Sequence, residues 1–378
     1  MKNPEVYAIS WKGFLPRHLF QIGLTSYVLM GHGEVHAGPE GMEIIDCGLG
    51  TNPLGMPPSM WDALKVLPEV DLSCYPSPEP ERLKKSIVEA YPCWHLDANQ
   101  ILTGRGSMAV LTALLRLLLP PGSVLSGPSP QFTDVVLQAL FHGAIYDPVV
   151  LKKPAFTLNV EDLMSILGKK PSVLYLDRPH NPTGQVLPLD ELETVTKEAL
   201  EKGVWVLVDE AYGDYLLPDE SACSLNYPNL ITSRSFSKGL GAAGLRVGYA
   251  VCRDEELTAL FRKVTPPFSV SRLDEELAVA VLKDTHFLSE TRSYVMEAKR
   301  RIINVIKGKL DWIVADTDMR TPIFFLSQRS GDLVARLYAA GIICEPGSGF
   351  MGLDNRFARL RVPAPDSLDL FLERLAHA

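Results

Sequence analysis

The sequence lacks the features of membrane proteins, secreted proteins and nucleic-acid-binding proteins. No apolar run approaches the roughly 20 residues that a membrane helix needs, and the opening residues, MKNPEVYAIS, lack the apolar segment of a signal peptide. No run of Lys and Arg exceeds three residues, and the formal net charge is -8. We therefore expect a cytoplasmic protein whose partners include neither nucleic acid nor a membrane.

The cysteines of the chain also lack any spacing that is typical of a metal site or a disulfide framework. The six cysteines are scattered along the chain and form no CxxC pair and no zinc-ligand spacing. We expect no metal site and no disulfide framework. Most of the thiols should be small buried hydrophobes in a reducing compartment.

Short apolar runs alternate with amphipathic segments over most of the chain. Candidate strands are 123–127, 172–177, 204–209, 230–235 and 246–252, and candidate helices begin near Ser107, Gln131, Pro188, Glu255, Arg272 and His286. Strands that are apolar on both faces and alternate with helices predict an α/β fold with a mostly parallel central sheet covered on both faces.

The length of 378 residues exceeds the size at which a single core usually stops growing, so two packed lobes are expected. We predict an N-terminal arm over residues 1–44 that joins the small lobe. A large domain would follow over residues 45–285, and a smaller α+β domain would cover residues 286–378.

Five segments at strand ends or helix starts carry unusual polar residues, and the strongest contains Lys238. This lysine lies between a candidate strand and a Gly-rich turn, so its amine can reach into a cleft and form an imine with an aldehyde. Ser235, Ser237 and Arg246 lie around it and supply donors for a dianionic phosphate. An isolated SxSK is more often a solvated surface lysine, so the other segments must support this interpretation.

Two further segments place polar side chains at strand ends. Asp209 and Tyr212 follow the apolar run VWVLV, where a buried carboxylate is costly unless something pairs with it. A protonated pyridine nitrogen would pair with Asp209, and a helix N-cap is the alternative. Asn181 lies in the turn HNPTG and would point its amide inward toward a phenolate oxygen, although an ordinary surface turn has the same sequence.

The last two segments concern an anion and an aromatic ring. The glycines of TGRGSM precede an amphipathic helix, so the backbone N–H groups of Ser107 and Met108 form an anion site at its N-terminus. Phe132 lies two residues after Pro130 and is placed to stack on a ring. A phenylalanine taken alone is more often part of a core.

The motifs HNPTG, DEAY, SFSKGLGAAGLRVGY and RLRV, in this order and spacing, resemble those of the fold-type-I pyridoxal-phosphate enzymes, aminotransferase class I/II. The resemblance runs from Cys47 to the C-terminus and is nearest to histidinol-phosphate aminotransferases and threonine-phosphate decarboxylases. It implies the PLP-dependent transferase fold, pyridoxal 5'-phosphate (PLP) as cofactor, and a homodimer with shared active sites.

The resemblance also implies roles for single residues. Lys238 resembles the Schiff-base lysine that also moves the Cα proton, and Asp209 the carboxylate that keeps the pyridine nitrogen protonated. Asn181 and Tyr212 resemble the pair on the phenolic oxygen, and Phe132 the stacking aromatic.

Other roles implied by the resemblance concern the phosphate and the substrate. The phosphate would be held by Ser107, Met108, Ser235, Ser237, Arg246 and, across the dimer interface, Tyr75 from the other chain. Arg361 resembles the arginine that clamps the substrate carboxylate, and Asn52 in TNPLG is also assigned to substrate binding.

Three departures from the family pattern bear on the substrate. Met108 and Ala109 replace an acidic pair, Arg178 replaces an asparagine, and Glu345 stands where relatives have an arginine that binds a substrate anion. A carboxylate there would repel a phosphate ester and favour a cationic side chain. The alternative is that Glu345 points elsewhere.

We expect an enzyme that acts on a small-molecule L-α-amino acid through a Lys238 aldimine and a quinonoid intermediate, with transamination as the leading reaction. Two alternatives share the fold: β/γ-elimination with cyclisation of an arginine derivative, as in capreomycidine-synthase-like enzymes, and Cα decarboxylation. A non-catalytic sensor is a third alternative, but such proteins carry a DNA-binding segment and this chain has no basic helix-turn-helix.

Overall fold

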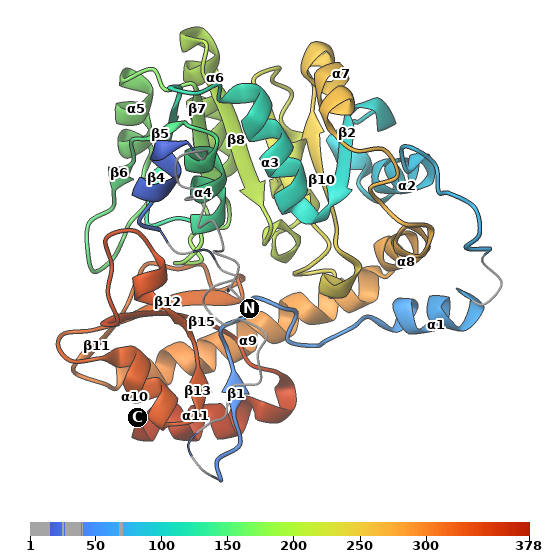
Figure 1. Cartoon of the computed structure of the whole chain (residues 1–378). Helices are drawn as coiled ribbons and strands as arrows, with labels where there is room; N and C mark the ends of the chain where they lie inside the picture. The colour runs from blue at the N-terminus through green and yellow to red at the C-terminus, as the bar shows by residue number, and fades with distance from the viewer. Residues whose placement is uncertain (1–15, 25, 27–38, 40, 68–70) are drawn as a thin grey trace, which may run out of the picture.

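The structure is a computed structural model that describes residues 16–24, 26, 39, 41–67 and 71–378. It contains a seven-stranded sheet flanked by helices and a four-stranded sheet that lies below it in Figure 1. The predicted α/β fold with a second, smaller part is therefore confirmed.

The large sheet has the strand order β2-β10-β9-β8-β7-β3-β5. Its strands are β2 (Ile101–Arg105), β3 (Val124–Ser126), β5 (Ile145–Tyr146), β7 (Val173–Asp177), β8 (Trp205–Glu210), β9 (Leu230–Ser235) and β10 (Val247–Cys252). All neighbours run parallel except β10, which is antiparallel to both β9 and β2. The mostly parallel sheet is as predicted, and β10 is its exception.

Apolar side chains on both faces of this sheet are covered by helices. One face packs against α3 (Gly106–Leu118), α4 (Thr133–Phe141) and α7 (Glu255–Val264). The other face packs against α5 (Val160–Gly168) and α6 (Leu189–Lys202). Each buried square ångström of apolar surface contributes about 25 cal/mol, so the continuous apolar runs of β7 and β8 account for their central place.

A third group of helices packs beside β10 and the edge strand β2. It consists of α1 (Pro58–Val66), α2 (Glu81–Ala90) and α8 (Arg272–Leu282). The side chain of Ser271 caps α8 by accepting the backbone N–H of Asp274. In Figure 1, α1 lies at the margin of the molecule, away from the central strands.

The long helix α9 (Thr285–Lys307) connects the two sheets, and Asp284 caps its start by accepting the N–H of Phe287. The smaller sheet has the order β11-β12-β15-β14 and is antiparallel throughout. Its strands are β11 (Trp312–Val314), β12 (Ile323–Gln328), β14 (Glu345–Pro346) and β15 (Phe357–Arg361), and helices α10 (Leu333–Ala339) and α11 (Leu368–His377) cover it.

The described part of the N-terminal arm contacts both parts of the molecule. The 3-10 helix η2 (Arg17–Gln21) lies on α4, where His18 Nε2 is 3.3 Å from the carbonyl oxygen of Phe141. After the arm, β1 (Ile45–Asp46) pairs in parallel with β13 (Ile342–Ile343). Most of residues 1–38 lie outside the described part, and the predicted domain limits stay a prediction.

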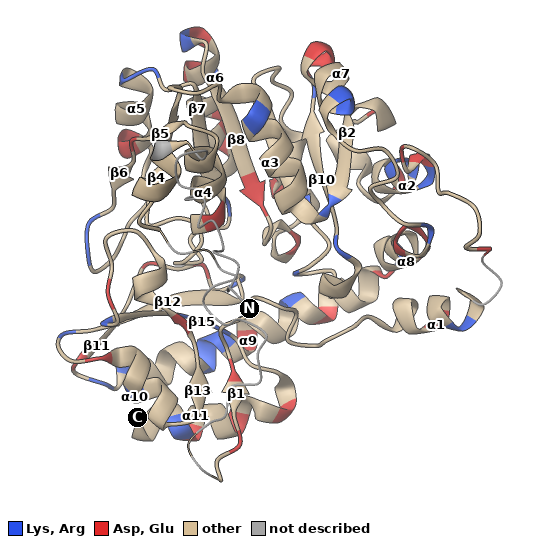
Figure 2. Cartoon of the chain, in the orientation of Figure 1, with Lys and Arg blue, Asp and Glu red and all other residues tan. Residues whose placement is uncertain are grey.

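The carboxyl end of β8 points toward the smaller sheet (Figure 1), and its parallel neighbours β7 and β9 end on the same side. In Figure 2 the tip of the β8 arrow is acidic, and it faces the space between the two sheets. Open α/β sheets bind ligands at this end of their strands. Among the described residues, no helix is long and apolar enough to cross a membrane, and no cluster of three metal-ligating side chains occurs.

Candidate active site

Lys238 lies just after β9, in the turn that faces the smaller sheet. Its Nζ is 5.6 Å from the centre of the Tyr212 ring. A Cβ atom on Gly50 would overlap the Tyr212 hydroxyl and lie 3.0 Å from Lys238 Nζ, so glycine is required at this approach. Burial, together with the nearby guanidinium groups of Arg359 and Arg246, lowers the pKa of Lys238 to about 8. A neutral amine is therefore accessible near physiological pH.

Asp209, in β8, presents a carboxylate with one free oxygen. Its Oδ2 accepts a hydrogen bond from the Tyr175 hydroxyl at 3.4 Å, whereas its buried Oδ1 has no hydrogen-bond partner among the described residues. Burial raises the pKa of Asp209 to about 6. The helical turn that follows begins at Gly213, and its N-cap is Tyr212, so Asp209 does not act as a helix cap. The unpartnered oxygen suits a protonated ring nitrogen.

Asn181 is buried in the turn after β7 and is not an ordinary surface residue. The turn is closed by the N–H of Gly184, which donates to the carbonyl of His180 at 2.7 Å. Arg359 Nη1 donates to Asn181 Oδ1 at 3.1 Å. With its oxygen held by Arg359, the amide presents its Nδ2 group as a donor on the other side.

The N-terminus of α3 forms one half of an anion site. The helix begins at Gly106, and no side chain caps it, so the backbone N–H groups of Ser107 and Met108 are open to a ligand. Gly106 has a φ of +74°, and a Cβ there would lie 2.7 Å from Arg246 Nη2. Glycine is needed for both reasons, and its absent side chain makes room for the guanidinium.

Arg246 and the serines beside Lys238 form the other half. Arg246 Nη1 donates to Ser237 Oγ at 3.2 Å, and the Ser237 N–H donates to Ser235 Oγ at 3.1 Å. These hydroxyls and the guanidinium converge with the start of α3. Together they supply the charge-assisted donors that a phosphate dianion requires.

Phe132 stands at the start of α4, partly buried in the cluster that covers one face of the large sheet. Its backbone N–H donates to Asp177 Oδ2 at 2.8 Å. The bond ties the residue to the end of β7, beside Asp209.

These groups fit pyridoxal phosphate. Cationic and N–H donors for a phosphate lie at the start of α3, and the unpartnered oxygen of Asp209 can accept a hydrogen bond from a ring nitrogen. Between these ends, Lys238 offers an amine, and Asn181 and Tyr212 offer donors for a ring oxygen.

Arg361 lies near Lys238 and Tyr212, because its charge acts on the pKa values of both, and its predicted role as the carboxylate clamp stays a prediction. Its Nη2 donates to the carbonyl of Asp46 at 2.8 Å and its Nη1 to the carbonyl of Val362 at 2.9 Å. Arg359, which shares its face of β15, reaches Asn181 and acts more strongly on Lys238. Sequence reasoning missed Arg359, although alternate residues of a strand share a face and RLR therefore contains both arginines as candidates.

Glu345 lies directly opposite Arg359 in the pairing of β14 with β15. Its Oε2 is 3.3 Å from Arg359 Nη2, and both side chains are buried. Arg359 Nη2 also donates to the carbonyl of Gly48 at 2.6 Å. Glu345 therefore acts on the site through Arg359.

Asn52 and Arg178 have their described hydrogen bonds within the chain. Asn52 Nδ2 donates to the carbonyl of Gly239 at 2.8 Å and to Thr291 Oγ1 at 3.2 Å, so donation to a substrate would have to replace one of these bonds. Arg178, which replaces the asparagine of the family pattern, is buried and pairs with Glu210 at 2.9 Å.

Tyr75 is 83% exposed, and its ring centre lies 4.9 Å from that of Phe268. A large exposed aromatic pair of this kind suits contact with another protein surface. Its role across a dimer interface stays a prediction.

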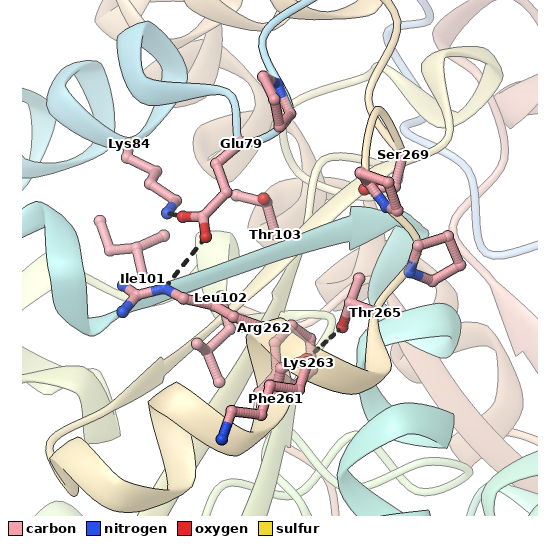
Figure 3. A pocket seen from close by; sticks show the side chains of 13 residues that line it. Glu79, Lys84, Ile101, Leu102, Thr103, Phe261, Arg262, Lys263, Thr265 and Ser269 are labelled. Atoms are coloured by element: carbon pink, nitrogen blue, oxygen red, sulfur yellow. Dashed lines mark hydrogen bonds and ion pairs between the residues drawn. The ribbon is translucent and has the colours of Figure 1, made fainter.

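A separate pocket of about 300 Å³ lies between β2, α2 and α7 (Figure 3). Glu79 lies between Lys84 and Arg262 in this pocket and forms ion pairs with both. None of the predicted site residues lines it. Its carboxylate is held by Lys84 and Arg262, so we assign the pocket no chemistry.

Comparison with known proteins places these residues in a wider context. The family model for aminotransferase class I and II matches residues 43–375. The histidinol-phosphate aminotransferase of Methanocaldococcus jannaschii is 28% identical over 343 residues, which cover 88% of each chain. That of Macrococcus caseolyticus is 34% identical over 63% of this chain and 67% of its own.

Two solved structures share the fold. Histidinol-phosphate aminotransferase from Sinorhizobium meliloti in complex with pyridoxal-5'-phosphate aligns with a TM-score of 0.80 at 22% identity, covering 95% of this chain and 96% of its own. A Thermus thermophilus aspartate aminotransferase double mutant aligns with a TM-score of 0.81 at 18% identity, covering 96% and 99%.

Proposed function

The chain belongs to the aminotransferase class I and II family, and from that premise we propose that it transfers the amino group of an L-α-amino acid to a 2-oxo acid. It is a PLP-dependent enzyme of the aminotransferase fold. The observation that carries the proposal is that Lys238 and Asp209 lie close enough for the charge of the lysine to act on the carboxylate. The pKa of Lys238 is lowered to about 8, and Asp209 Oδ1 has no hydrogen-bond partner within the described chain.

Each group has a task in such a reaction. When bound, PLP supplies a ring that accepts electrons from the substrate Cα. Lys238 Nζ would take the proton from Cα and pass it to the cofactor carbon that forms the imine, because its neutral form is accessible near pH 8. Asp209 would keep the ring nitrogen protonated, and Asn181 Nδ2 and the Tyr212 hydroxyl would hold the ring oxygen.

We assign the substrate carboxylate to Arg359. Arg361 would instead stabilise β15 through its hydrogen bonds to backbone carbonyls. Arg359 contacts Asn181, which we assign to the ring oxygen, so its guanidinium would lie beside the bound cofactor. A carboxylate would accept a charge-assisted bond from it. The matched pair Arg359→Met and Arg361→Met tests this assignment. Arg359→Met should raise KM by about tenfold or more, as expected for loss of one charged contact. An equal or larger rise for Arg361→Met would overturn it.

Glu345 bears on the class of side chain that the substrate carries. Its carboxylate offsets part of the charge of Arg359, so the site holds less net positive charge than its arginines suggest. A substrate with a phosphate would meet this carboxylate, whereas a basic side chain would be attracted to it. We therefore favour an amino acid with a cationic side chain.

Histidinol phosphate is the second candidate, favoured by the 28% identity over 88% of the chain with an enzyme named for it. The deciding experiment compares kcat/KM for basic amino acids and for histidinol phosphate, each with and without a 2-oxo acid, with products identified by mass spectrometry. Efficient turnover of histidinol phosphate would exclude the cationic substrate. Products formed without the oxo acid would favour elimination–cyclisation, and release of carbon dioxide would favour decarboxylation.

We also propose a homodimer in which Tyr75 serves the partner's site. A Lys238→Ala chain mixed with a Tyr75→Ala chain should form heterodimers with one intact site each, so activity should exceed the sum of the two parents. Full activity in a monomer would overturn the proposal. Sedimentation of the wild-type protein measures the oligomeric state independently.

A further inference from the structure

A second carboxylate, Asp177, lies beside Asp209 and has no task in the mechanism above. β7 and β8 are parallel neighbours, and their pairing sets Asp177 directly opposite Asp209. Residues paired in this way point to the same face of the sheet. Both carboxyl groups are buried, with 4% and 5% of their surface exposed.

The hydroxyl of Tyr175 lies between the two carboxylates. It is 2.5 Å from Asp177 Oδ1 and 3.4 Å from Asp209 Oδ2. The second oxygen of Asp177 accepts the backbone N–H of Phe132. Asp177 is thus joined to Asp209 through a phenol, and to the residue expected to stack on the cofactor.

The charges around this pair are not balanced. The titratable groups that act on Asp177 or feel it are Asp209 on β8 and the phenols of Tyr175, Tyr146 and Tyr212. Lys238 acts as a cation on Asp209. Burial, together with the charge of Asp209, raises the pKa of Asp177 to about 8. Two charged carboxylates at this spacing in a buried site would repel each other strongly.

We propose that Asp177 is a positioning residue that confines the negative charge of the pair to Asp209 and orients that carboxylate toward the ring nitrogen. As an acid, Asp177 donates its proton to the Tyr175 oxygen, and Tyr175 donates its own to Asp209 Oδ2. These two hydrogen bonds hold Oδ2 of Asp209 and leave its Oδ1 as the acceptor for the ring nitrogen. The role rests on the proposed function, because it concerns the carboxylate that serves the cofactor.

Three variants separate an acid from a carboxylate at this position. Asp177→Asn keeps the shape, one acceptor and one donor, and so imitates the acid. It should keep kcat within about threefold of the wild type, whereas Asp177→Ala and Tyr175→Phe should lower kcat by about tenfold or more with little change in KM. Asp177→Asn should also leave the pH dependence of the bound cofactor's absorption unchanged. If the Asn variant is impaired as severely as the Ala variant, Asp177 acts as a charge and the proposal is wrong.

A readout on the apoprotein needs neither cofactor nor substrate. At pH 7 the infrared spectrum should contain the carbonyl band of a buried carboxylic acid, which disappears in Asp177→Asn and, in the wild type, above about pH 8. The folded-state pKa is raised, so its stabilising effect is complete below the ordinary carboxyl value of 3.8 and is lost progressively as pH rises from there to about 8. The Asn variant should therefore gain stability relative to the wild type over that rise.

Each outcome decides one of the two claims. A missing band, or no relative gain for the Asn variant, would overturn the role of Asp177. A normal band in a protein that transaminates none of the tested substrates would overturn the proposed function and leave the arrangement of the pair intact.

Discussion

At the end of β8, each face of the large sheet carries a buried carboxylate, and the two carboxylates differ in whether other residues of the chain neutralise them. Asp209 and Glu210 are consecutive residues of β8, so they point to opposite faces. Glu210 accepts from Arg178 Nη1 and from Arg234 Nη1, each at 2.9 Å, and from the N–H of Ala222 at 2.8 Å. Asp209 has the Tyr175 hydroxyl on one oxygen and no described partner on the other.

The difference separates charges that stabilise the fold from charges that are available to a ligand. Taking a carboxylate out of water costs several kcal/mol, and only close partners offset that cost. Arg178 and Arg234 offset it for Glu210 within the chain, whereas for Asp209 we propose that the cofactor supplies the partner. Because successive side chains of a strand point to opposite faces, the end of β8 can carry one carboxylate that stabilises the fold and one that is available to a ligand.

The largest effect is expected at Lys238, the amine on the unbalanced face. Lys238→Ala should lower kcat by at least about 10⁴-fold, because one side chain provides both the covalent bond and the general base. Borohydride reduction of the wild type should leave the cofactor mass on the peptide that contains Lys238. A reduced adduct on another lysine would show that the site lies elsewhere.

A matched pair on β8 tests the comparison itself. Asp209→Asn should lower kcat by at least about 10²-fold while leaving the free energy of unfolding of the apoprotein within about 1 kcal/mol of the wild type. Glu210→Gln should do the reverse and lower that free energy by about 3–5 kcal/mol, because it leaves two buried arginines without their full partner. Urea denaturation and kcat measurements on both variants provide the check. Similar profiles for the two would remove the distinction.

Glu345 and Arg359 pair with each other and yet lie in the site. They therefore test whether a charge that is paired within the chain can still act on a ligand. Glu345→Gln should release Arg359 and shift the ratio of kcat/KM values by about tenfold toward substrates with an anionic side chain. Glu79→Gln, which alters the paired carboxylate in the pocket of Figure 3, is the control and should leave the ratio unchanged. An unchanged ratio in both variants would assign Glu345 to stability alone.

The smallest effect concerns the pH dependence of cofactor capture. Only a neutral amine forms an imine, so the rate at which apoprotein takes up PLP should rise with pH and level off above about 8. Arg359→Met removes a neighbouring cation and should move this midpoint upward by less than about one unit, equivalent to about 1.4 kcal/mol. Stopped-flow absorbance across pH measures both curves. A wild-type midpoint near the ordinary lysine value would contradict the lowered pKa.

Much of the large sheet could be predicted because its strands are continuous apolar runs. The ranges 172–177, 204–209, 230–235 and 246–252 agree with β7 to β10 within one residue at each end. β2 was not predicted, since ILTGR contains Gly104, whose Cβ would collide with Val110 of α3. Close packing against a helix is a tertiary requirement that periodicity does not reveal.

The site was only partly predictable, and the reason differs between residues. Lys238, Asp209 and Asn181 stand in motifs whose chemistry can be read locally. Arg359 and Asp177 become recognisable only when strand pairing is known, because each acts through a residue on another element.

A hydrogen bond between Arg359 and Asn181 joins the smaller sheet to the loop after β7. It fixes which way round the Asn181 amide lies, since the oxygen is held and the nitrogen is turned outward. With Arg359 assigned to the substrate carboxylate as proposed, a substrate that draws Arg359 toward itself would loosen that hold and leave the Asn181 amide freer to rotate. The position of the substrate would then be felt at the proposed ring-oxygen contact before any covalent bond of the substrate changes.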